Sequence, residues 1–240
     1  MTVQDKYQSF QKDQRAFFDK LITEDWESYH CSYWDQQRTF EIDSIFQYLE
    51  SGIQRVLDVG CGCGFHDKLI ADIPGIEKVI GIDYSEKSIE KANEFYPHPK
   101  VERSVADLST YRAPHFDLIV SFQVIEHVED PVDFLSQCCR LTRQGGWIAI
   151  STPNRHALEN RLRNLIGFDS KFVDPMHFKE YSHKEMIQMG NQINLKCIYQ
   201  VSYGCSLSYG NRQIRFPEFI GKRIPSISSS FLTVFRTPID

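Results

Sequence analysis

The chain has no long apolar run, no excess of positive charge and no framework of paired cysteines. No stretch of about 18 uninterrupted apolar residues occurs, so we expect no transmembrane helix. The formal net charge is -5, whereas nucleic-acid-binding surfaces are usually basic, so we expect no nucleic-acid partner. The first residues are polar and of mixed charge, which argues against a secretory signal. Together these absences predict a cytoplasmic protein with no integral membrane segment.

The cysteines do not form a recognisable metal or disulfide pattern. Their number is seven, which is odd, and this fits a reducing cytosol. Cys61 and Cys63 stand one residue apart between glycines, and no C-x-x-C pair accompanies them. We therefore interpret both as small turn residues. Cys138 and Cys139 lie in a helical pattern, and we expect them in the core.

The most informative stretch is residues 55–64, Arg-Val-Leu-Asp-Val-Gly-Cys-Gly-Cys-Gly. Its apolar start predicts a buried parallel strand. Glycine at every second position leaves backbone that can turn sharply and lie against a ligand. Residues 65–71 suit a helix whose first N–H groups would point back into the turn. The stretch predicts a small-molecule site, with a purely structural turn as the alternative, and it lacks the G-x-G-x-x-G spacing of a nicotinamide dehydrogenase.

Further strands and helices alternate along the rest of the chain. We expect strands at 78–83, 101–105, 116–122, 147–150, 196–203 and 231–236. This rhythm is typical of a doubly wound α/β fold with a mostly parallel sheet. Ligands in such sheets bind outside the carboxyl ends of the strands, and Asp83, Asp107 and Phe122 fall at that edge beside Gly60.

Helices and connections complete the sequence prediction. Residues 1–24 form an amphipathic pattern, and a second apolar stripe begins at Ile42 and ends at Leu49. The pair Gly145-Gly146 is expected to end the helix that precedes the strand at 147–150. Ser182 and Glu185 form a capping box for a helix to about residue 190. Residues 155–181 and 204–230 are expected to be long connections over the ligand site.

Six short motifs occur in an order and spacing that resemble the class I S-adenosylmethionine (SAM) methyltransferases, in the small-molecule branch that includes ubiquinone-biosynthesis O-methyltransferases. They lie at 56–62, 81–85, 106–108, 116–120, 126–131 and 145–147. The match covers roughly residues 38–203. The resemblance implies a Rossmann-like sheet of seven strands whose last strand is antiparallel and lies inside the sheet. We expect a single domain, with a helical cap (1–50), a SAM-binding core (51–151) and substrate-side loops with the last strands (152–240).

The resemblance also implies SAM as the cofactor and assigns residues to it. Asp83 holds the ribose, Asp107 and the Leu108 backbone bind the adenine, and Phe122 packs near the adenosine or sulfonium. Asp58 lies near the ammonium group, and Arg38 is either a partner of the carboxylate or a surface charge. The predicted SAM-binding residues are Arg38, Asp58, Gly60, Cys61, Gly62, Gly64, Asp83, Tyr84, Asp107, Leu108 and Phe122.

A departure from the ubiquinone branch concerns metal binding. That branch carries Glu-x-x-Glu-His after the fourth strand, and this chain has Gln123 in place of the first glutamate, followed by Glu126 and His127. Hard cations favour charged oxygen ligands. The sequence therefore predicts no metal.

The predicted function is SAM-dependent methylation of a small molecule, at a hydroxyl oxygen rather than at nitrogen or carbon. A hydroxyl acceptor must lose its proton, and His127 and His177 are the candidate bases. Tyr181, near His177, is the third candidate catalytic residue. Each histidine could instead serve only to order its loop. A non-catalytic SAM-fold partner or scaffold remains the rival interpretation.

Substrate recognition is expected outside the central sheet. Aromatic residues around Trp34, together with Tyr181 and residues 212–219, are the predicted walls of an acceptor pocket. Covering a core edge is the alternative role for the N-terminal aromatics. Arginines at 155, 161, 163, 212 and 215 indicate either an anionic acceptor or a solvated charged face. We expect a monomer or a homodimer.

Overall fold

The computed structural model forms two compact units, Met1–Val120 and Ser121–Asp240. It describes residues 3–24, 32–49, 52–168, 176–209, 212–215, 221 and 223–239. Seven strands form one sheet in the order β3-β2-β1-β4-β5-β9-β6. Strand β4 (Phe116–Phe122) contains the boundary between the units. This is the mostly parallel, doubly wound sheet that the sequence predicts.

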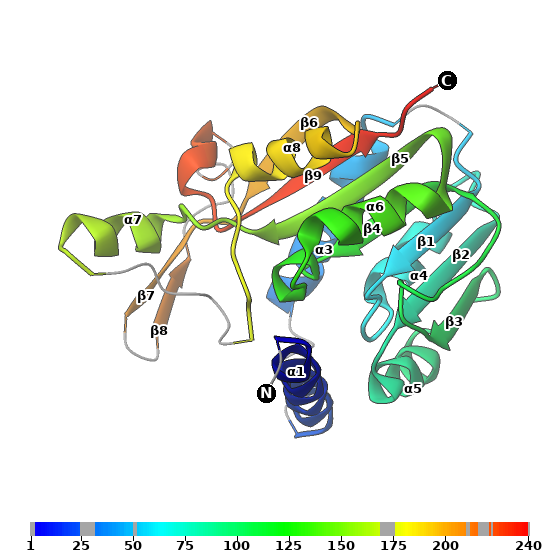
Figure 1. Cartoon of the computed structure of the whole chain (residues 1–240), viewed down its shortest axis with the longest axis horizontal. Coiled ribbons are helices and arrows are strands. Elements are labelled where there is room, and N and C mark those ends of the chain that lie inside the picture. Colours follow the sequence, from blue (N-terminus) through cyan, green and yellow to red (C-terminus); the bar gives the residue numbers. More distant parts are fainter. Residues whose placement is uncertain are drawn as a thin grey trace. The chain divides into compact units, whose positions relative to one another are not determined.

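The first unit contains three parallel strands, the first in the predicted apolar start of residues 55–64 and the other two with the predicted bounds. They are β1 (Arg55–Val59), β2 (Lys78–Asp83) and β3 (Val101–Val105), with α4 and α5 beside them in Figure 1. Strand β2 lies between the other two, pairing Val79 with Val56 on β1 and with Val101 on β3. The interior residues of β1 are fully buried, as expected for a parallel strand that is covered on both faces.

The helices of the first unit are α1 (Val3–Glu24), α3 (Ser32–Phe46), α4 (Phe65–Ala71) and α5 (Glu86–Phe95). The Ser85 hydroxyl accepts a hydrogen bond from the Ser88 N–H (3.1 Å) and caps α5, as predicted. Helix α3 begins ten residues before the predicted apolar stripe. The stripe marks only the buried side of the helix around Ile42 and Ile45, whereas residues 35–40 before it are exposed or partly exposed.

In the second unit, β9 (Ser230–Arg236) is antiparallel to both β5 (Thr142–Pro153) and β6 (Lys196–Tyr203). The predicted antiparallel strand inside the sheet is thus confirmed. Strand β5 begins earlier than predicted because α6 (Pro131–Leu141) already ends at Leu141. Gly145 therefore lies within the strand, with φ 60°, and does not end the helix.

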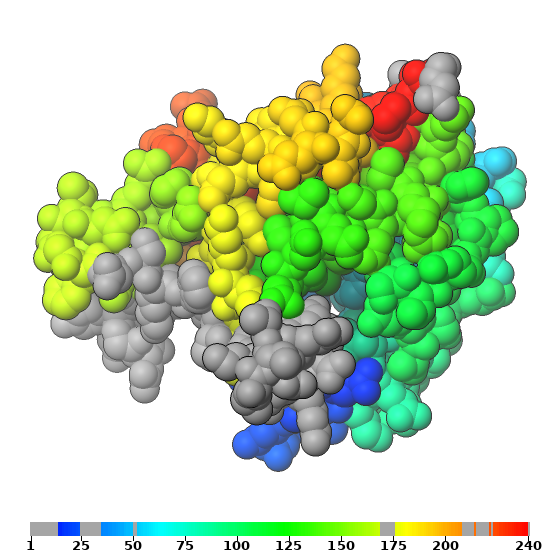
Figure 2. All heavy atoms as spheres, in the orientation of Figure 1, coloured from blue at the N-terminus to red at the C-terminus, as the bar shows by residue number. Residues whose placement is uncertain are grey.

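The remaining helices of this unit are η1 (Ile125–His127), α7 (Leu158–Leu165), α8 (His183–Gln192) and η2 (Pro225–Ile227). Helices α6 and α8 pack together and lie side by side on the visible surface (Figure 2). The predicted capping box of α8 is present, with both the Ser182 and the Glu185 bonds formed.

Both late connections contain regular structure that the sequence prediction lacks. The first includes α7, and the second includes a hairpin of β7 (Ser206–Tyr209) and β8 (Arg212–Arg215). These elements are short and mostly polar, so they carry little apolar periodicity. Within the described part of the chain, no helix is both long and apolar enough to span a membrane.

Candidate functional site

The turn after β1 is built from left-handed glycines. Gly60, Gly62 and Gly64 have φ values of 74°, 51° and 81°, a region that side chains with a Cβ rarely occupy. The Gly60 and Cys61 N–H groups both donate to the Ile82 carbonyl, at 2.8 and 3.1 Å. The turn is thereby attached to the end of β2, and α4 starts directly after it.

Asp58 lies at the start of this turn and is only 1% exposed. Among the described residues, neither of its carboxylate oxygens has a hydrogen-bond partner. Burial, followed by the nearby Asp67 and Asp83 carboxylates, raises the pKa of Asp58 well above its ordinary value. An unpartnered buried carboxylate is costly, and a positively charged ligand beside it would offset that cost. The ammonium and sulfonium groups of SAM fit this environment.

Asp83 ends β2 and connects the glycine turn to α5. Its Oδ2 accepts a hydrogen bond from the Gly62 N–H (2.9 Å), and its Oδ1 accepts one from the Ser85 N–H (2.8 Å). Burial raises the pKa of Asp83, while these two backbone bonds act in the opposite direction. The carboxylate is therefore held in one orientation at the carboxyl end of the sheet, where the sequence predicts the ribose-binding acid.

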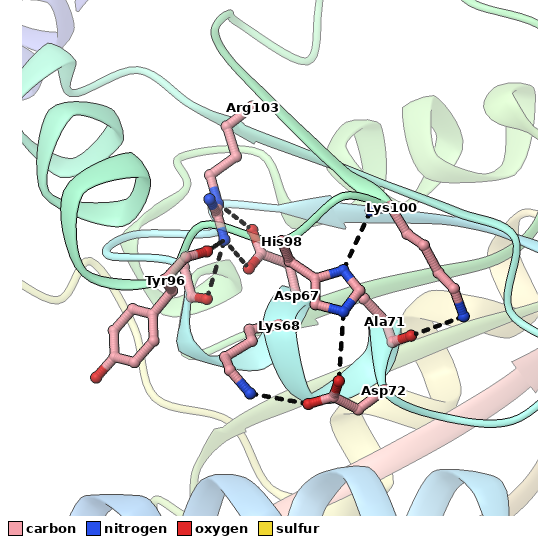
Figure 3. Close-up of polar contacts among 9 residues, drawn as sticks. Asp67, Lys68, Ala71, Asp72, Tyr96, His98, Lys100 and Arg103 are labelled. Carbon is pink, nitrogen blue, oxygen red and sulfur yellow. Dashed lines mark hydrogen bonds and ion pairs between the residues drawn. The ribbon is translucent and has the colours of Figure 1, made fainter.

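A buried ion pair supports the turn from the side of α4 (Figure 3). The Arg103 guanidinium donates to both oxygens of Asp67, each at 2.7 Å, and also to the Tyr96 carbonyl at 2.8 Å. The two side chains are 2% and 0% exposed. A Cβ built on Gly64 would lie 2.8 Å from Arg103 Nε and 2.7 Å from the Ala92 Cβ, so only glycine fits. Sequence reasoning missed Asp67 and Arg103, because their pairing joins a helix to a strand 36 residues away.

Helix α1 contacts the residues that follow Asp83. The Ser85 hydroxyl donates to Asp19 Oδ1 (2.6 Å), and Arg15 donates to the Tyr84 carbonyl. The Arg15 guanidinium also lies over the Tyr84 ring, 5.3 Å from its centroid. The N-terminal helix is therefore fixed to the predicted cofactor-binding loop by two polar side chains, neither of which the apolar periodicity of α1 indicates.

Three other predicted SAM-binding residues of this unit are Arg38 on α3 and Asp107 and Leu108 after β3. Arg38 bonds Asp35 (3.3 Å), and its guanidinium lies 5.2 Å from the centroid of the Phe65 ring, at the first residue of α4. Asp107 accepts from the Ser109 N–H (2.8 Å) in a tight turn after β3, and Leu108 beside it is buried. Arg38 is thus close to the glycine turn, whereas the adenine-binding role of Asp107 stays a prediction.

The two cysteines of the turn behave as small buried residues. Cys61 and Cys63 are each 5% exposed. Burial raises the pKa of the Cys61 thiol well above its ordinary value and that of Cys63 to about 12. Both thiols are therefore protonated near neutral pH. Because the thiolate is the form that attacks electrophiles and binds metals, neither cysteine is suited to these roles.

The second unit brings the predicted histidines together. Glu126 and His127 belong to η1, and His177 comes from the segment before α8. The two imidazole rings are 4.7 Å apart, centroid to centroid, in an edge-to-face arrangement. One ligand atom from each of Glu126, His127 and His177 lies within 4.8 Å of the others. Glu126 is a member that the sequence analysis did not assign to the site.

Three further residues that the sequence analysis singled out in this unit are Phe122, Gln123 and Tyr181. Phe122 is buried at the end of β4. Gln123 has a left-handed φ of 57°, and its amide donates to the Ser151 hydroxyl at 3.2 Å and to the Tyr203 hydroxyl at 3.4 Å. Tyr181 is 1% exposed, and burial raises the pKa of its hydroxyl. Burial of this kind suits packing better than proton transfer, so the catalytic role of Tyr181 stays a prediction.

The arginines proposed for an anionic acceptor have partners within the protein. Arg155 pairs with Glu185 (2.7 Å), and Arg161 donates to the carbonyls of His156 and Ser226. Arg163 lies over the Phe168 ring, 5.8 Å from its centroid. The side chains of Trp34, Arg212 and Arg215, and all of residues 216–219, lie outside the described residues, so the pocket walls proposed there stay predictions.

Known proteins share both the motif region and the fold. Residues 57–150 match the methyltransferase domain family. A protein of Mycolicibacterium smegmatis named "Probable S-adenosylmethionine-dependent methyltransferase" is 36% identical over 135 residues, covering 56% of this chain and 49% of its own. The ubiquinone biosynthesis O-methyltransferase of Thiobacillus denitrificans is 38% identical over 109 residues, covering 43% and 46%. The chain thus spans about half the length of these relatives.

Solved structures resemble the whole fold. The N-methyltransferase NodS of Bradyrhizobium japonicum, in complex with S-adenosyl-L-homocysteine, aligns with a TM-score of 0.61 at 16% identity, covering 97% of this chain and 98% of its own. An S-adenosylmethionine-dependent methyltransferase of Mesorhizobium loti aligns with a TM-score of 0.58 at 17% identity, covering 82% and 97%. At these identities the likeness concerns the fold alone.

The sheet order, the glycine turn and the acid after β2 define a class I methyltransferase fold. Within this fold, residues 57–150 are similar to the methyltransferase domain family, and the relatives that share this region include proteins named S-adenosylmethionine-dependent methyltransferases.

Proposed function

We propose that the protein binds SAM and transfers its methyl group to a hydroxyl oxygen of a small molecule. The observation that carries this proposal is the unpartnered, buried carboxylate of Asp58 beside a turn of left-handed glycines. The electrostatics of this region favour a cation, because the nearby Asp67 and Asp83 carboxylates outnumber the one guanidinium, that of Arg103, that acts on Asp58. SAM supplies such positive charge on its sulfonium and ammonium groups.

The first unit supplies the cofactor-binding residues. Asp83 accepts from the ribose hydroxyls with lone pairs that its two backbone bonds leave over, and the glycine turn follows the methionine portion. Arg38, fixed near the start of α4, pairs with the SAM carboxylate. Asp107 and the Leu108 backbone bind the adenine. Each of these roles follows from the family resemblance. Asp83 and Asp107 also lie at or after the carboxyl ends of β2 and β3, whereas Arg38 lies on α3.

The reaction is an in-line displacement at the methyl carbon. A lone pair of the acceptor oxygen forms the new C–O bond while the C–S bond breaks, and its electrons stay on sulfur to give S-adenosylhomocysteine. Holding the two reactants in line supplies much of the acceleration. The acceptor also loses a proton, for which the cluster of Glu126, His127 and His177 is the candidate site.

The arrangement of the histidines supports their part in this proton transfer. The Glu180 carboxylate accepts from His177 Nδ1–H at 3.0 Å, so Nε2 is the basic nitrogen of that ring. His127 is oriented in the same way by the Met176 carbonyl, also at 3.0 Å. An imidazole that is oriented by a fixed acceptor is the usual arrangement of a general base.

The finer features of the proposal rest on the relatives. Oxygen as the target follows the name of the ubiquinone O-methyltransferases, of which that of Thiobacillus denitrificans is similar over 43% of this chain. The argument for a carboxylate- or phosphate-bearing acceptor is weaker than the sequence alone indicates, because the described arginines that carried it have partners within the protein. We further propose a cytoplasmic protein that acts as a monomer or homodimer and has no nucleic-acid substrate.

Calorimetry and turnover assays test the proposal. The purified chain should bind SAM and S-adenosylhomocysteine with one site per chain, and should not bind NAD. Incubation with methyl-labelled SAM and mixed small-molecule extracts, followed by mass spectrometry, should give a labelled product whose methyl is on oxygen. Binding of NAD in preference to SAM would refute the cofactor assignment. SAM binding without any labelled product across such extracts would favour the scaffold interpretation.

A further inference from the structure

The cluster in the second unit combines residues from two segments about 50 positions apart. Glu126 is fully buried, and His177 is 7% exposed. The Glu126 carbonyl accepts from the Phe178 N–H (2.8 Å) and from the Lys179 N–H (3.3 Å). The segment that carries His177 is therefore fastened directly to the residue whose side chain completes the cluster.

Both imidazoles are oriented by partners that fix which nitrogen carries the proton. The Met176 carbonyl can only accept, so His127 Nδ1 is the donor over the 3.0 Å that separates them. The Glu180 carboxylate, also fully buried, accepts from His177 Nδ1 at 3.0 Å. In both rings Nε2 is then the nitrogen suited to a metal. Metal-binding histidines usually donate their other N–H to a carboxylate or a carbonyl in this way.

The Glu126 carboxylate has one bonded and one unbonded oxygen. Its Oε2 accepts from the Thr152 hydroxyl at 3.1 Å. Its Oε1 is buried and has no hydrogen-bond partner among the described residues. Leaving a buried carboxylate oxygen unsatisfied is unfavourable. A cation at the cluster would satisfy this oxygen and compensate the negative charge of Glu126 and Glu180.

We propose that Glu126, His127 and His177 bind one divalent transition-metal ion, with zinc as the representative. Two imidazole nitrogens and one carboxylate oxygen are the ligand set of catalytic zinc sites, which keep a position open. Imidazole suits zinc, iron and copper, whereas magnesium and calcium prefer oxygen ligands. The site therefore differs in chemistry from a cluster of carboxylates and favours a softer metal.

This proposal replaces the prediction that the chain binds no metal. That prediction rested on Gln123, which has its own bonds to Ser151 and Tyr203 and does not belong to the cluster. The third ligand is supplied instead by His177, which no local motif connects to residues 126–127. Metal binding stands independently of the proposed methyl transfer. Only its catalytic consequence, a lowered pKa of a coordinated acceptor hydroxyl, rests on that function.

Metal binding is tested on the purified full chain after dialysis against a chelator. Calorimetric titration with ZnCl₂ should show one site per chain at micromolar affinity or better, retained in excess magnesium. Because cysteines also bind zinc, Co²⁺ should be added in parallel. Its absorption spectrum should lack the charge-transfer bands of thiolate ligands. A spectrum dominated by these bands, or no saturable zinc binding, would overturn the proposal.

Variants locate the metal. His177→Ala and Glu126→Gln should each weaken zinc binding by more than tenfold, and Glu180→Gln should weaken it by about 10- to 100-fold by releasing His177. His156→Ala is the matched control, because His156 is exposed and lies outside the cluster. Circular dichroism establishes that each variant is folded, and Glu126→Gln keeps the shape of the side chain. Folded variants that bind zinc like the unaltered chain would refute the assignment.

Parallel SAM titration separates this proposal from the proposed function. If zinc binds at the cluster and SAM does not bind, the metal site stands and the methyltransferase proposal fails. If SAM binds and the product forms while zinc binding is absent, the metal proposal fails and the methyltransferase proposal stands.

Discussion

The two units build their functional residues in different ways. In the first, the site follows from a short continuous stretch, because Asp58 and the three glycines lie within seven residues and Asp83 joins them by a bond to Gly62. In the second, residues 126–127 meet residues 176–180 through bonds across a gap of about 50 positions. A local motif therefore specifies the first site, whereas tertiary folding specifies the second.

The units also differ in how their charges are used. The first unit buries an arginine–aspartate pair and leaves the buried Asp58 carboxylate without a partner among the described residues. In the second, the ion pairs of Glu185 with Arg155 and Lys179 are partly exposed and secure a helix end. Breaking a buried pair leaves an uncompensated charge, while a partly exposed pair can be replaced by water. We expect mutations to separate the two cases clearly.

The largest effect is expected for Arg103→Ala. The change leaves Asp67 buried without its partner, and the free energy of unfolding should fall by about 3–5 kcal/mol. Denaturant unfolding measures the change. The matched control is Lys68→Ala, which removes the exposed 2.8 Å pair with Asp72 and should cost no more than about 0.5 kcal/mol. Equal losses in both variants would contradict the distinction between the two kinds of pair.

Asp83→Ala should weaken SAM binding by about 2–4 kcal/mol, because charge-assisted bonds to the ribose disappear together with the bond that orients the turn. Calorimetric titration with SAM measures the loss. Asp83→Asn retains the shape of the side chain but not its charge. Its SAM affinity should lie between that of the unaltered chain and that of Asp83→Ala. SAM affinity within about twofold of the unaltered chain would remove Asp83 from the cofactor site.

Asp58 should make stability depend on pH. Its pKa is raised in the folded state, so the folded protein holds this proton more tightly than the unfolded chain does. Stability should therefore fall as the pH rises from the ordinary aspartate pKa, about 3.9, through the folded value. The slope for one proton is at most about 1.4 kcal/mol per pH unit.

Asp58→Asn should remove this part of the slope, as measured by denaturant unfolding at several pH values without SAM. Asp67 and Asp83 also have raised pKa values and supply the slope that remains. An unchanged slope in the variant would show that Asp58 ionises normally in the folded protein.

The smallest effect is expected for Glu185→Gln in the second unit. Burial acts to raise the pKa of Glu185, but hydrogen bonds from Ser182 and Lys179 and the charge of Arg155 outweigh it and lower the pKa to about 2. The stabilisation is therefore complete above pH 4.5 and is lost as the pH falls toward 2. At pH 7 the change should cost about 1 kcal/mol, and the difference should vanish near pH 2. A constant difference across this range would show that charge is not its source.

The sequence predicted most of the sheet and the position of the glycine turn, whereas the assigned cofactor contacts stay predictions. Strands β2, β3, β4 and β6 have the predicted bounds, and β1 lies in the predicted apolar start of residues 55–64. The turn after β1 is also predictable from the sequence, because glycine is the residue that most readily adopts the positive φ values found there. Helix α7 and the β7–β8 hairpin were missed because they are short and polar.

The rest of the site depends on contacts that sequence spacing does not encode. Asp67 with Arg103, Asp19 with Ser85, and Glu126 with His177 each join separate segments. Ser85 was predicted correctly as a helix cap, but its bond to Asp19 has no local signal. Glu126 could have been suspected from its place next to His127, although only the fold shows that its carboxylate is buried with an unbonded oxygen.

The position of β9 has a consequence for how the chain is made. Translation produces β5 and β6 before β9, yet β9 lies between them and pairs with both. During synthesis, these two strands therefore have unpaired backbone edges until residues 230–236 emerge from the ribosome. Exposed edges of this kind invite pairing with other chains. Nascent chains stalled before residue 230 should accordingly depend on chaperones far more than chains released after residue 236.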